Sequence, residues 1–347
     1  MKINDIKIGL KHPPVIIAEM SGNHNNSIDT AMELVEIAAK SGAQILKLQT
    51  YTPDTMTINC SNKYFKINNK KSPWNGRNLY ELYGEASTPW KWHKEIIKKA
   101  NKLGLETIST PFDSTAVDFL EELKVPAYKI ASFENNDYKL IKKICSTKKP
   151  IIMSTGLLSL TNLSETYEFL KEHSKRNFAL LKCTSNYPSN PSDSNILTIS
   201  NMRKIFDCEI GLSDHTLGIG VPIASVALGA TLIEKHFTKS RKLGGVDSAF
   251  SLEPNELKNL VNETKIAWKS LGKVKYEIQK NELPSLQFKR SIFIIKDIKK
   301  NETLKSKNIK IIRPGYGLEP KYFDLVIGRK VKCDLKKGTP LSWNLLF

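Results

Sequence analysis

The chain alternates short apolar segments with amphipathic stretches through most of its length. Each apolar segment is five or six residues long, the usual length of a buried strand, and the stretches between them repeat apolar residues at helical spacing. This alternation is typical of α/β proteins with a parallel sheet, and eight strands favour a closed (β/α)8 TIM barrel over a doubly wound sheet, although periodicity alone does not decide closure. The predicted strands cover residues 15–19, 45–50, 105–109, 127–131, 150–154, 178–183, 208–213 and 231–236.

Chain length leaves room for a second, smaller domain. The 347 residues exceed the ~250 of an ordinary barrel, and the sequence after residue 272 changes character. Predicted helices at 27–41, 88–103, 137–146, 164–173, 218–229 and 253–271 complete the barrel pattern. We therefore predict a barrel over residues 1–272, a polar linker over 273–287 and a small β-rich domain with several turn signals over 288–347.

The chain carries a formal net charge of +18, which is compatible with a nucleic-acid partner, an anionic substrate or a lysine-rich background. The last 61 residues hold fifteen Lys or Arg against five Asp or Glu, so more than half of the excess lies there. This tail has no recognised nucleic-acid-binding motif, and its aromatic residues do not align as a stacking surface. A solvated basic surface is the favoured interpretation, with no nucleic-acid partner.

Cysteines and apolar runs bear on the cellular location. The five cysteines are scattered and form no C-x-x-C pair, which predicts reduced thiols rather than disulfides or a zinc site. No run approaches the ~18 apolar residues of a membrane span, and charges occur within the first ten residues, where a secretory signal needs an apolar run. We expect a cytoplasmic protein that has no membrane partner.

Strand alternation predicts which polar side chains enter the barrel. Lys47 and Gln49 share the interior face of their strand, Lys129 points inward from another, and Glu234 and His236 share one face. Lys235 then points outward, which is a misfit for a charged residue unless the strand has already ended. Because the polar residues gather near strand C-terminal ends, they match the position of barrel active sites.

The inward lysines have two interpretations. Either one alone could be a structural residue held in a salt bridge. Two buried ammonium groups close together are costly unless an anion lies between them, so Lys47 and Lys129 also predict an anionic, phosphate-bearing ligand. Hydroxyl residues near other strand ends could complete its cradle, although each alone is typical of a helix cap or turn: Thr110, Ser132, Ser154, Thr184 and Ser213.

Histidines follow the seventh and eighth predicted strands, which are neighbours in a barrel. His215 and His236 could converge on one divalent metal with open positions for a ligand, although buried histidines are often only hydrogen-bonded. His24 lies on the first predicted loop, where it could contact substrate or stabilise a turn.

Several motifs resemble the sialic acid synthase family in order and spacing. The tail, with Asp297-Ile298 and the stretch 312–315 (IRPG), resembles that family's antifreeze-like (SAF) domain. The motifs are 18–25 (AEMSGNHN), 47–50 (KLQT), 109–113 (STPFD), 128–132 (YKIAS), 154–156 (STG), 211–216 (GLSDHT) and 234–238 (EKHFT).

The resemblance implies an enzyme that condenses phosphoenolpyruvate with an open-chain amino-sugar aldehyde and water, giving a nine-carbon sugar acid and phosphate. It also implies a divalent metal, Mn²⁺ or Mg²⁺, and a domain-swapped homodimer in which one chain's C-terminal domain caps the other's barrel. Residues 74–83, 88–90 and 131–134 look most like the branch that makes pseudaminic acid from a 2,4-diacetamido-2,4,6-trideoxy sugar. The branches that make N-acetylneuraminate and legionaminate are the alternatives within the family.

Residue roles carry over by position. By resemblance, phosphoenolpyruvate is held by Lys47, Thr110, Lys129, Ser132, Ser154 and Ser213, and the metal by His215 and His236. The sugar or the reacting atoms face Glu19, Gln49, Glu134, Tyr187 and Asp247, with Glu19 or Glu134 handling the water, while Arg313 reaches into the partner's site. Ser185 stands where the sialic acid synthase pattern has Asn, which favours a different sugar.

A second mechanism is compatible with interior lysines. Lys129 or Lys47 could form a Schiff base with pyruvate in an aldolase. Inactivation by borohydride in the presence of pyruvate separates this mechanism from the condensation above.

Overall fold

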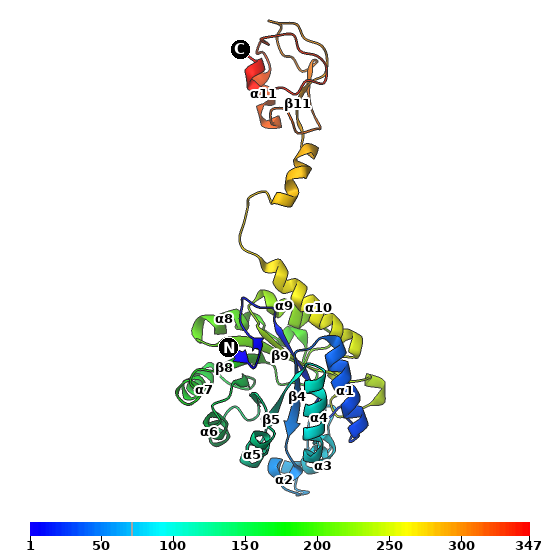
Figure 1. Cartoon of the computed structure of the whole chain (residues 1–347), viewed down its shortest axis with the longest axis vertical. Helices are drawn as coiled ribbons and strands as arrows, with labels where there is room; N and C mark the ends of the chain where they lie inside the picture. Colours follow the sequence, from blue (N-terminus) through cyan, green and yellow to red (C-terminus); the bar gives the residue numbers. More distant parts are fainter. Residues whose placement is uncertain (71) are drawn as a thin grey trace. The chain divides into compact units, whose positions relative to one another are not determined.

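A computed structural model describes residues 1–70 and 72–347 and divides the chain into two compact units, Met1–Gly272 and Lys273–Phe347. Eight parallel strands of the first unit form a closed barrel (Figure 1), in which the last strand pairs with the first, Leu232 beside Val15. The predicted TIM barrel is confirmed. Its strands are β3 (Val15–Glu19), β4 (Ile45–Thr50), β5 (Glu106–Pro111), β6 (Tyr128–Ile130), β7 (Ile151–Ser154), β8 (Phe178–Cys183), β9 (Glu209–Asp214) and β10 (Leu232–His236).

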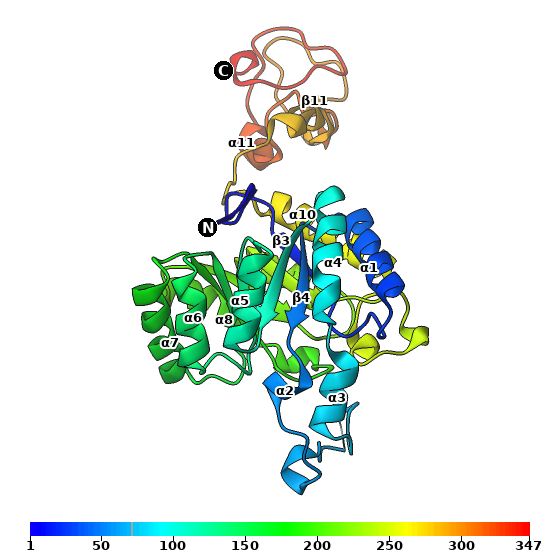
Figure 2. The same ribbon diagram turned by 60° about the horizontal axis from the view of Figure 1, so that its bottom comes forward.

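Helices surround the strands (Figure 2), and local sequence explains where they start and stop. In α1 (Ile28–Ser41), the Ser27 side chain accepts a hydrogen bond from the Thr30 amide at the N-terminus, and Gly42 adopts φ 83° at the C-terminus. Its apolar face, including Leu34 and Val35, is fully buried. The other barrel helices are α4 (Trp90–Lys102), α5 (Ser114–Glu122), α6 (Tyr138–Ser146), α7 (Leu160–His173), α8 (Leu197–Ile205), α9 (Gly220–Ala227) and α10 (Pro254–Leu271).

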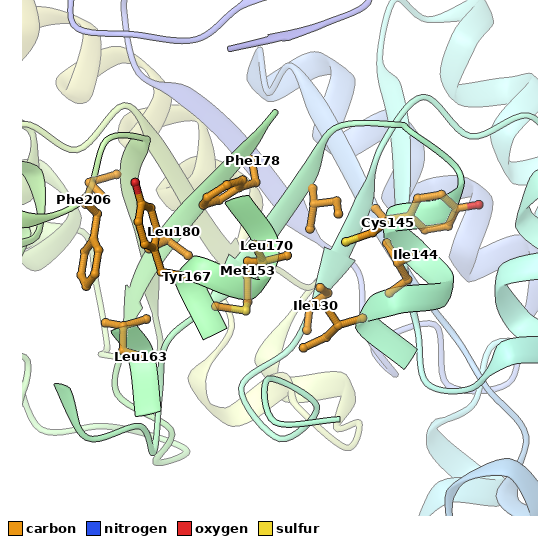
Figure 3. Close-up of a cluster of buried hydrophobic side chains, with 14 of the residues drawn as sticks. Ile130, Ile144, Cys145, Met153, Leu163, Tyr167, Leu170, Phe178, Leu180 and Phe206 are labelled. Carbon is orange, nitrogen blue, oxygen red and sulfur yellow. The ribbon is translucent and has the colours of Figure 1, made fainter. Parts of the chain in front are cut away.

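The strands separate two cores. Outside the barrel, the faces of β6, β7 and β8 pack on α6, α7 and α8 through side chains such as Met153, Leu180 and Leu170 (Figure 3). Inside, a second cluster fills the N-terminal part of the barrel and includes Ile17, Ile45, Ile108, Ala127, Ile152, Leu181 and Leu232. Two residues further along each of these strands the inward position is polar or a thiol, so the interior changes from apolar to polar toward the strand C-terminal ends.

A hairpin of β1 (Lys2–Ile3) and β2 (Ile6–Lys7) contributes to the apolar end of the interior, where Ile3 is fully buried. We expect Ile3→Val to lower the free energy of unfolding by about 0.5–1.5 kcal/mol, because the lost methylene leaves a void in a packed core. Urea unfolding of the full chain measures this effect. The control is Ile58→Val at a position that is 61% exposed, where we expect a negligible change. Equal effects of the two changes would contradict a packing role for the hairpin.

A long insertion separates β4 from α4. It contains α2 (Pro53–Met56), the 3-10 helix η1 (Lys63–Phe65) and α3 (Leu79–Ala86), which lie beyond the end of β4 (Figure 2). Loops after barrel strands carry substrate contacts in enzymes of this fold, so the insertion is placed to shape a site.

The second unit has its own small core. Strands β11 (Ser291–Ile294) and β12 (Ile309–Ile312) pair antiparallel, and α11 (Phe323–Val326) and isolated bridges complete the unit. Residues 273–287, expected to be a linker, belong to this unit and include most of the 3-10 helix η5 (Lys280–Phe288). Among the described residues, no helix has both the length and the apolar character needed to cross a membrane.

Candidate active site

A cavity of about 300 Å³ opens at the C-terminal ends of the barrel strands. The insertion after β4 and the loops after β8 and β10 contribute further walls. Most of the predicted site residues line this cavity: Lys47, Gln49, Lys129, Ser132, Glu134, Ser154, Tyr187, Ser213, His215, His236 and Asp247. The structure therefore gathers in one place side chains that lie far apart in the sequence.

The other predicted residues lie at or beyond the margin of the cavity. Glu19 is fully buried beneath it and accepts a hydrogen bond from Gln49 at 2.8 Å. Thr110 lies beside Gln49 in the sheet, and its Oγ1 has no hydrogen-bond partner in the part of the chain that the structure describes. Ser185 Oγ lies 3.7 Å from Cys183 Sγ, which lines the cavity. Arg313 is an exposed residue of the second unit.

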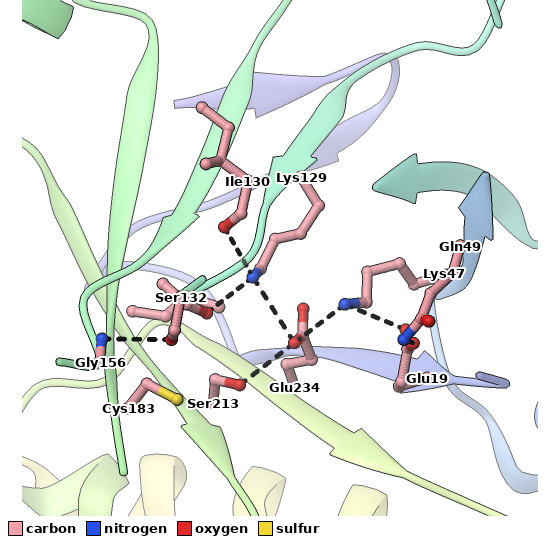
Figure 4. Close-up of polar contacts among 12 residues, drawn as sticks. Glu19, Lys47, Gln49, Lys129, Ile130, Ser132, Gly156, Cys183, Ser213 and Glu234 are labelled. Atoms are coloured by element: carbon pink, nitrogen blue, oxygen red, sulfur yellow. Dashed lines mark hydrogen bonds and ion pairs between the residues drawn. The ribbon is translucent and has the colours of Figure 1, made fainter. Parts of the chain in front are cut away.

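A network of buried charges forms the floor of the cavity (Figure 4). Lys47 Nζ lies 3.1 Å from both Glu19 Oε2 and Glu234 Oε1, and Lys129 Nζ lies 3.7 Å from Glu234 Oε1. Glu234 therefore supplies the anion between the two lysines that the sequence argument assigned to a ligand. Both lysines are held in salt bridges within the chain, as the structural interpretation expects, and the binding of an anionic ligand between them stays a prediction.

Burial and the neighbouring charges shift the pKa values of the groups in this network. Burial opposes the ionisation of Glu234, but Lys129 and Lys47 outweigh it and lower the pKa of Glu234 to about 2. Burial lowers the pKa of Lys129 to about 8, with Glu234 opposing the shift. Burial also raises the pKa of Glu19, although Lys47 opposes this. The network therefore contains one strongly acidic carboxyl group and one carboxyl group that is harder to ionise.

Hydroxyl groups pack closely around Lys129. Its Nζ donates to Ser154 Oγ at 2.6 Å and to the Ile130 carbonyl at 3.1 Å, and the Gly156 amide donates to Ser132 Oγ at 3.2 Å. A Cβ at Gly156 would lie only 2.2 Å from Ser185 Oγ and 2.6 Å from Ser132 Oγ. Only glycine therefore lets the serines approach the floor this closely.

The two predicted metal-binding histidines lie side by side, with ring centroids 5.4 Å apart. His215 Nδ1 donates to the Thr184 carbonyl at 3.0 Å, so Nε2 is the nitrogen that would be free to bind a metal once the ring is neutral. Burial lowers the pKa of His215, but Cys183 and the Thr184 carbonyl outweigh it and raise that pKa. Burial, reinforced by the charge of His215, lowers the pKa of His236 and keeps it neutral. Within the described residues, His236 Nδ1 has no hydrogen-bond partner, and Asp247 Oδ2 lies 3.8 Å from it.

This donor set fits a metal only in part. Two imidazoles with free nitrogens could hold a divalent ion that takes its other ligands from substrate and water. Among the described residues, no group of three or more His, Cys, Asp or Glu is arranged to hold a metal. Such an ion would therefore depend on His215 and His236 as its protein ligands.

A buried ion pair holds the backbone on both sides of His215. Lys235 points out of the barrel as predicted, and its ammonium group pairs with Asp214 and donates to the Thr216 carbonyl. Asp214 in turn accepts from the Thr216 amide at 3.2 Å and from its hydroxyl at 2.9 Å. Lys235 is therefore not a misfit, because this contact fixes the backbone that carries both histidines.

The sequence of residues 34–276 matches the NeuB family, and residues 289–346 match the SAF domain. The chain belongs to the NeuB family. This match confirms the family resemblance drawn from the motifs and the small C-terminal domain that they predicted.

Relatives in the NeuB family align with this chain over nearly its full length. A pseudaminic acid synthase of Helicobacter pylori is 44% identical over 95% of this chain and 97% of its own. A pseudaminic acid synthase of Campylobacter jejuni is 41% identical over 94% of this chain and 95% of its own. The crystal structure of an N-acetylneuraminic acid (sialic acid) synthetase from Leptospira borgpetersenii, 31% identical, superposes with a TM-score of 0.73 and covers 83% of this chain and 95% of that one.

Some residues at the cavity were not among the sequence predictions for the site. Ser21 donates to Asp247, and Glu234 and Cys183 line the floor. Strand alternation marked Glu234 as inward, and the same alternation could have found Cys183 two residues beyond Leu181. Ser21 lies within a family motif, although nothing in its local pattern indicated its partner.

His24 has a structural role. Its Nδ1 accepts from the Asn26 amide at 3.2 Å, and its Nε2 lies 3.1 Å from Thr88 Oγ1. Of the two interpretations left open by the sequence, the stabilised turn is the one that these contacts support.

Proposed function

We propose that this chain is a pseudaminic acid synthase, a transferase that condenses phosphoenolpyruvate with the open-chain aldehyde of 2,4-diacetamido-2,4,6-trideoxy-β-L-altropyranose and water, giving pseudaminic acid and phosphate. The observation that carries the proposal is the 44% identity, over nearly the whole chain, to a relative of that activity. The cavity supports it, since its floor carries two lysines and several hydroxyl groups while the wall from the insertion is apolar.

Phosphoenolpyruvate binds at the floor in this proposal. The ammonium groups of Lys47 and Lys129 line the cavity and attract the anion, and Glu234 holds both of them in place. Hydroxyl groups of Ser132, Ser154 and Ser213, with Thr110 nearby, complete the cradle for the phosphate and carboxylate. Desolvation strengthens the attraction between this network and an anion.

A divalent metal, Mn²⁺ or Mg²⁺, is part of the proposal and is held by His215 and His236. When bound, such an ion polarises a carbonyl oxygen as a Lewis acid. Tyr187 packs on His215 with ring centroids 4.3 Å apart and limits where a sugar can lie beside that ring. The cavity walls thus hold the aldehyde next to the enol carbon. This positioning makes the reaction of the two bound substrates effectively unimolecular.

Glu134 is the residue that we assign to the attacking water. Its Oε2 is buried and unpartnered among the described residues, and burial raises the pKa of Glu134 to about 7 although Lys129 opposes the shift. A carboxyl group that titrates near neutrality can accept the proton of the water that adds to the former enol carbon. Glu19 is less suited to this step, because Lys47 and Gln49 already engage it.

The assembled state is a further part of the proposal. We place the enzyme in the cytoplasm as a domain-swapped homodimer in which Arg313 of one chain reaches the cavity of the other. Exposure of Arg313 on the second unit is compatible with this role. Phosphoenolpyruvate and the amino sugar are the small-molecule partners.

The proposal is tested by offering three amino sugars to the purified protein with phosphoenolpyruvate and Mn²⁺. We expect phosphate release to be fastest with the trideoxyaltrose derivative, slower with the legionaminic acid precursor and slowest with N-acetylmannosamine. Phosphate release with none of the sugars would refute the synthase assignment. Borohydride inactivation that requires pyruvate would instead support the Schiff-base aldolase.

A further inference from the structure

The insertion between β4 and α4 gives the cavity an apolar wall. Eight described residues of this segment line the cavity, and all are apolar or aromatic: Tyr51, Met56, Ile67, Trp74, Leu79, Leu82, Tyr83 and Ala86. The floor residues, in contrast, come from the ends of the barrel strands and are mostly charged or hydroxyl-bearing. The cavity therefore has lining of two chemical kinds, contributed by two different parts of the fold.

The wall is packed firmly against the barrel. The Trp74 indole N–H donates to the Val246 carbonyl at 2.9 Å, and the Trp74 ring lies 5.7 Å from that of Tyr187. A Cβ at Gly22 would lie 3.2 Å from Ala86, so the end of α3 approaches the loop after β3 closely. Because its N–H is already used, Trp74 offers a ligand only its apolar ring.

The orientation of a sugar in this cavity follows from its chemistry. The aldehyde carbon must lie where it can meet the enol carbon of phosphoenolpyruvate, close to the lysines of the floor and to the histidines. The far end of an open-chain hexose then extends away from the floor, toward the wall from the insertion. A methyl group at that end gains from burial on aliphatic side chains such as those of Met56, Ile67 and Leu79, whereas a hydroxyl group beside them would lose its water without gaining a partner from these side chains.

We propose that the apolar wall, centred on Met56, Ile67 and Leu79, is a subsite for the methyl end of a 6-deoxy sugar and selects against sugars with a hydroxyl group at C6. This inference rests on the proposed synthase function and names the part of the chain that reads the far end of the substrate. Apolar pockets discriminate a methyl group from a hydroxyl-bearing analogue by roughly ten- to a hundredfold.

The test compares the 2,4,6-trideoxy sugar with the matching 2,4-dideoxy sugar that keeps the 6-hydroxyl. We expect kcat/KM of the unmodified enzyme to favour the deoxy sugar by roughly ten- to a hundredfold. Leu79→Asn and Ile67→Thr, which place polar atoms in the wall, should lose most of this preference and leave the KM for phosphoenolpyruvate unchanged. The control is Leu197→Asn at a residue that is 75% exposed, which should keep the preference.

Two results would overturn the inference. One is equal kcat/KM for the two sugars with the unmodified enzyme. The other is a decrease in kcat/KM by the same factor for both sugars in the wall variants, which would leave the preference unchanged. If no sugar supports phosphate release, the synthase function fails, and calorimetric binding of the two reduced, unreactive alditols still decides the subsite. A preference for the deoxy alditol that Leu79→Asn removes would support the subsite, and equal or absent binding would reject it.

Discussion

Glu234→Gln is expected to destabilise the barrel by about 3–5 kcal/mol at neutral pH, because it leaves two buried lysines without the carboxylate between them. Glu234 is buried, with its Oε1 near both Lys47 and Lys129. Its folded-state pKa of about 2 lies below that of an ordinary glutamate, so its contribution is complete above the unfolded-state pKa. That contribution is lost as the pH falls from about 4.5 toward 2. Urea unfolding of the unmodified protein and the variant over this pH range measures the effect. The difference between their free energies of unfolding should become smaller as the pH falls.

Glu168→Gln is the matched control. Glu168 pairs with Lys171 at 3.0 Å on an exposed helix face, and such pairs contribute at most about 1 kcal/mol. Adding Lys129→Met to Glu234→Gln should restore part of the lost stability, since it removes one uncompensated charge. A Glu234→Gln variant as stable as the control at pH 7 would show that the network contributes little to folding.

Strand alternation was sufficient to place the floor residues. A strand exposes alternate side chains to one face, so the direction of Lys47, Lys129 and Glu234 follows from their place in each segment. Parallel strands that close into a barrel bring their C-terminal ends to one rim. For these reasons the position of the cavity and many of its polar residues could be predicted from the sequence.

The pairing of the charges could not be predicted in the same way. Lys47 meets Glu234 only because β10 pairs with β3 and β3 with β4, which brings the first and last strands together. Lys235 was treated as a misfit for the same reason, since its partner Asp214 lies on the neighbouring strand β9. Such contacts depend on the register of barrel closure, which no local pattern encodes.

The apolar wall was also beyond the reach of periodicity. The described residues between β4 and α4 form short helices and an isolated β-bridge, so apolar positions such as Ile67 and Trp74 follow no strand or helix repeat. Their direction is set by tertiary contacts, for example the hydrogen bond from Trp74 to Val246. For an irregular insertion of this kind, the sequence shows that many residues are apolar but does not show where their side chains point.

Glu134→Gln is expected to lower kcat by roughly 10²–10⁴-fold, because it removes the group that accepts the proton of water. If the Glu134 carboxylate is the base, activity of the unmodified enzyme must fall as the pH drops below about 7, the pKa to which burial raises this residue. The residual activity of the Glu134→Gln variant should not show this fall in activity at acidic pH. Steady-state phosphate release measured from pH 5.5 to 8.5 (a span of roughly 1.5 units to either side of that value) checks both expectations.

Two comparisons separate this role from simple damage to the site. Glu165→Gln on the exposed face of α7 should leave both the rate and the pH profile unchanged. Glu19→Gln perturbs the partners of Lys47 and Gln49, so it should lower activity without removing the fall in activity below about pH 7. If Glu19→Gln abolished the fall in activity below pH 7 while Glu134→Gln retained it, the assignment of the proton acceptor to Glu134 would be wrong. The base would then be Glu19, which is ion-paired with Lys47. Water would have to add to the former enol carbon from the floor of the barrel rather than from the loop after β6, which carries Glu134.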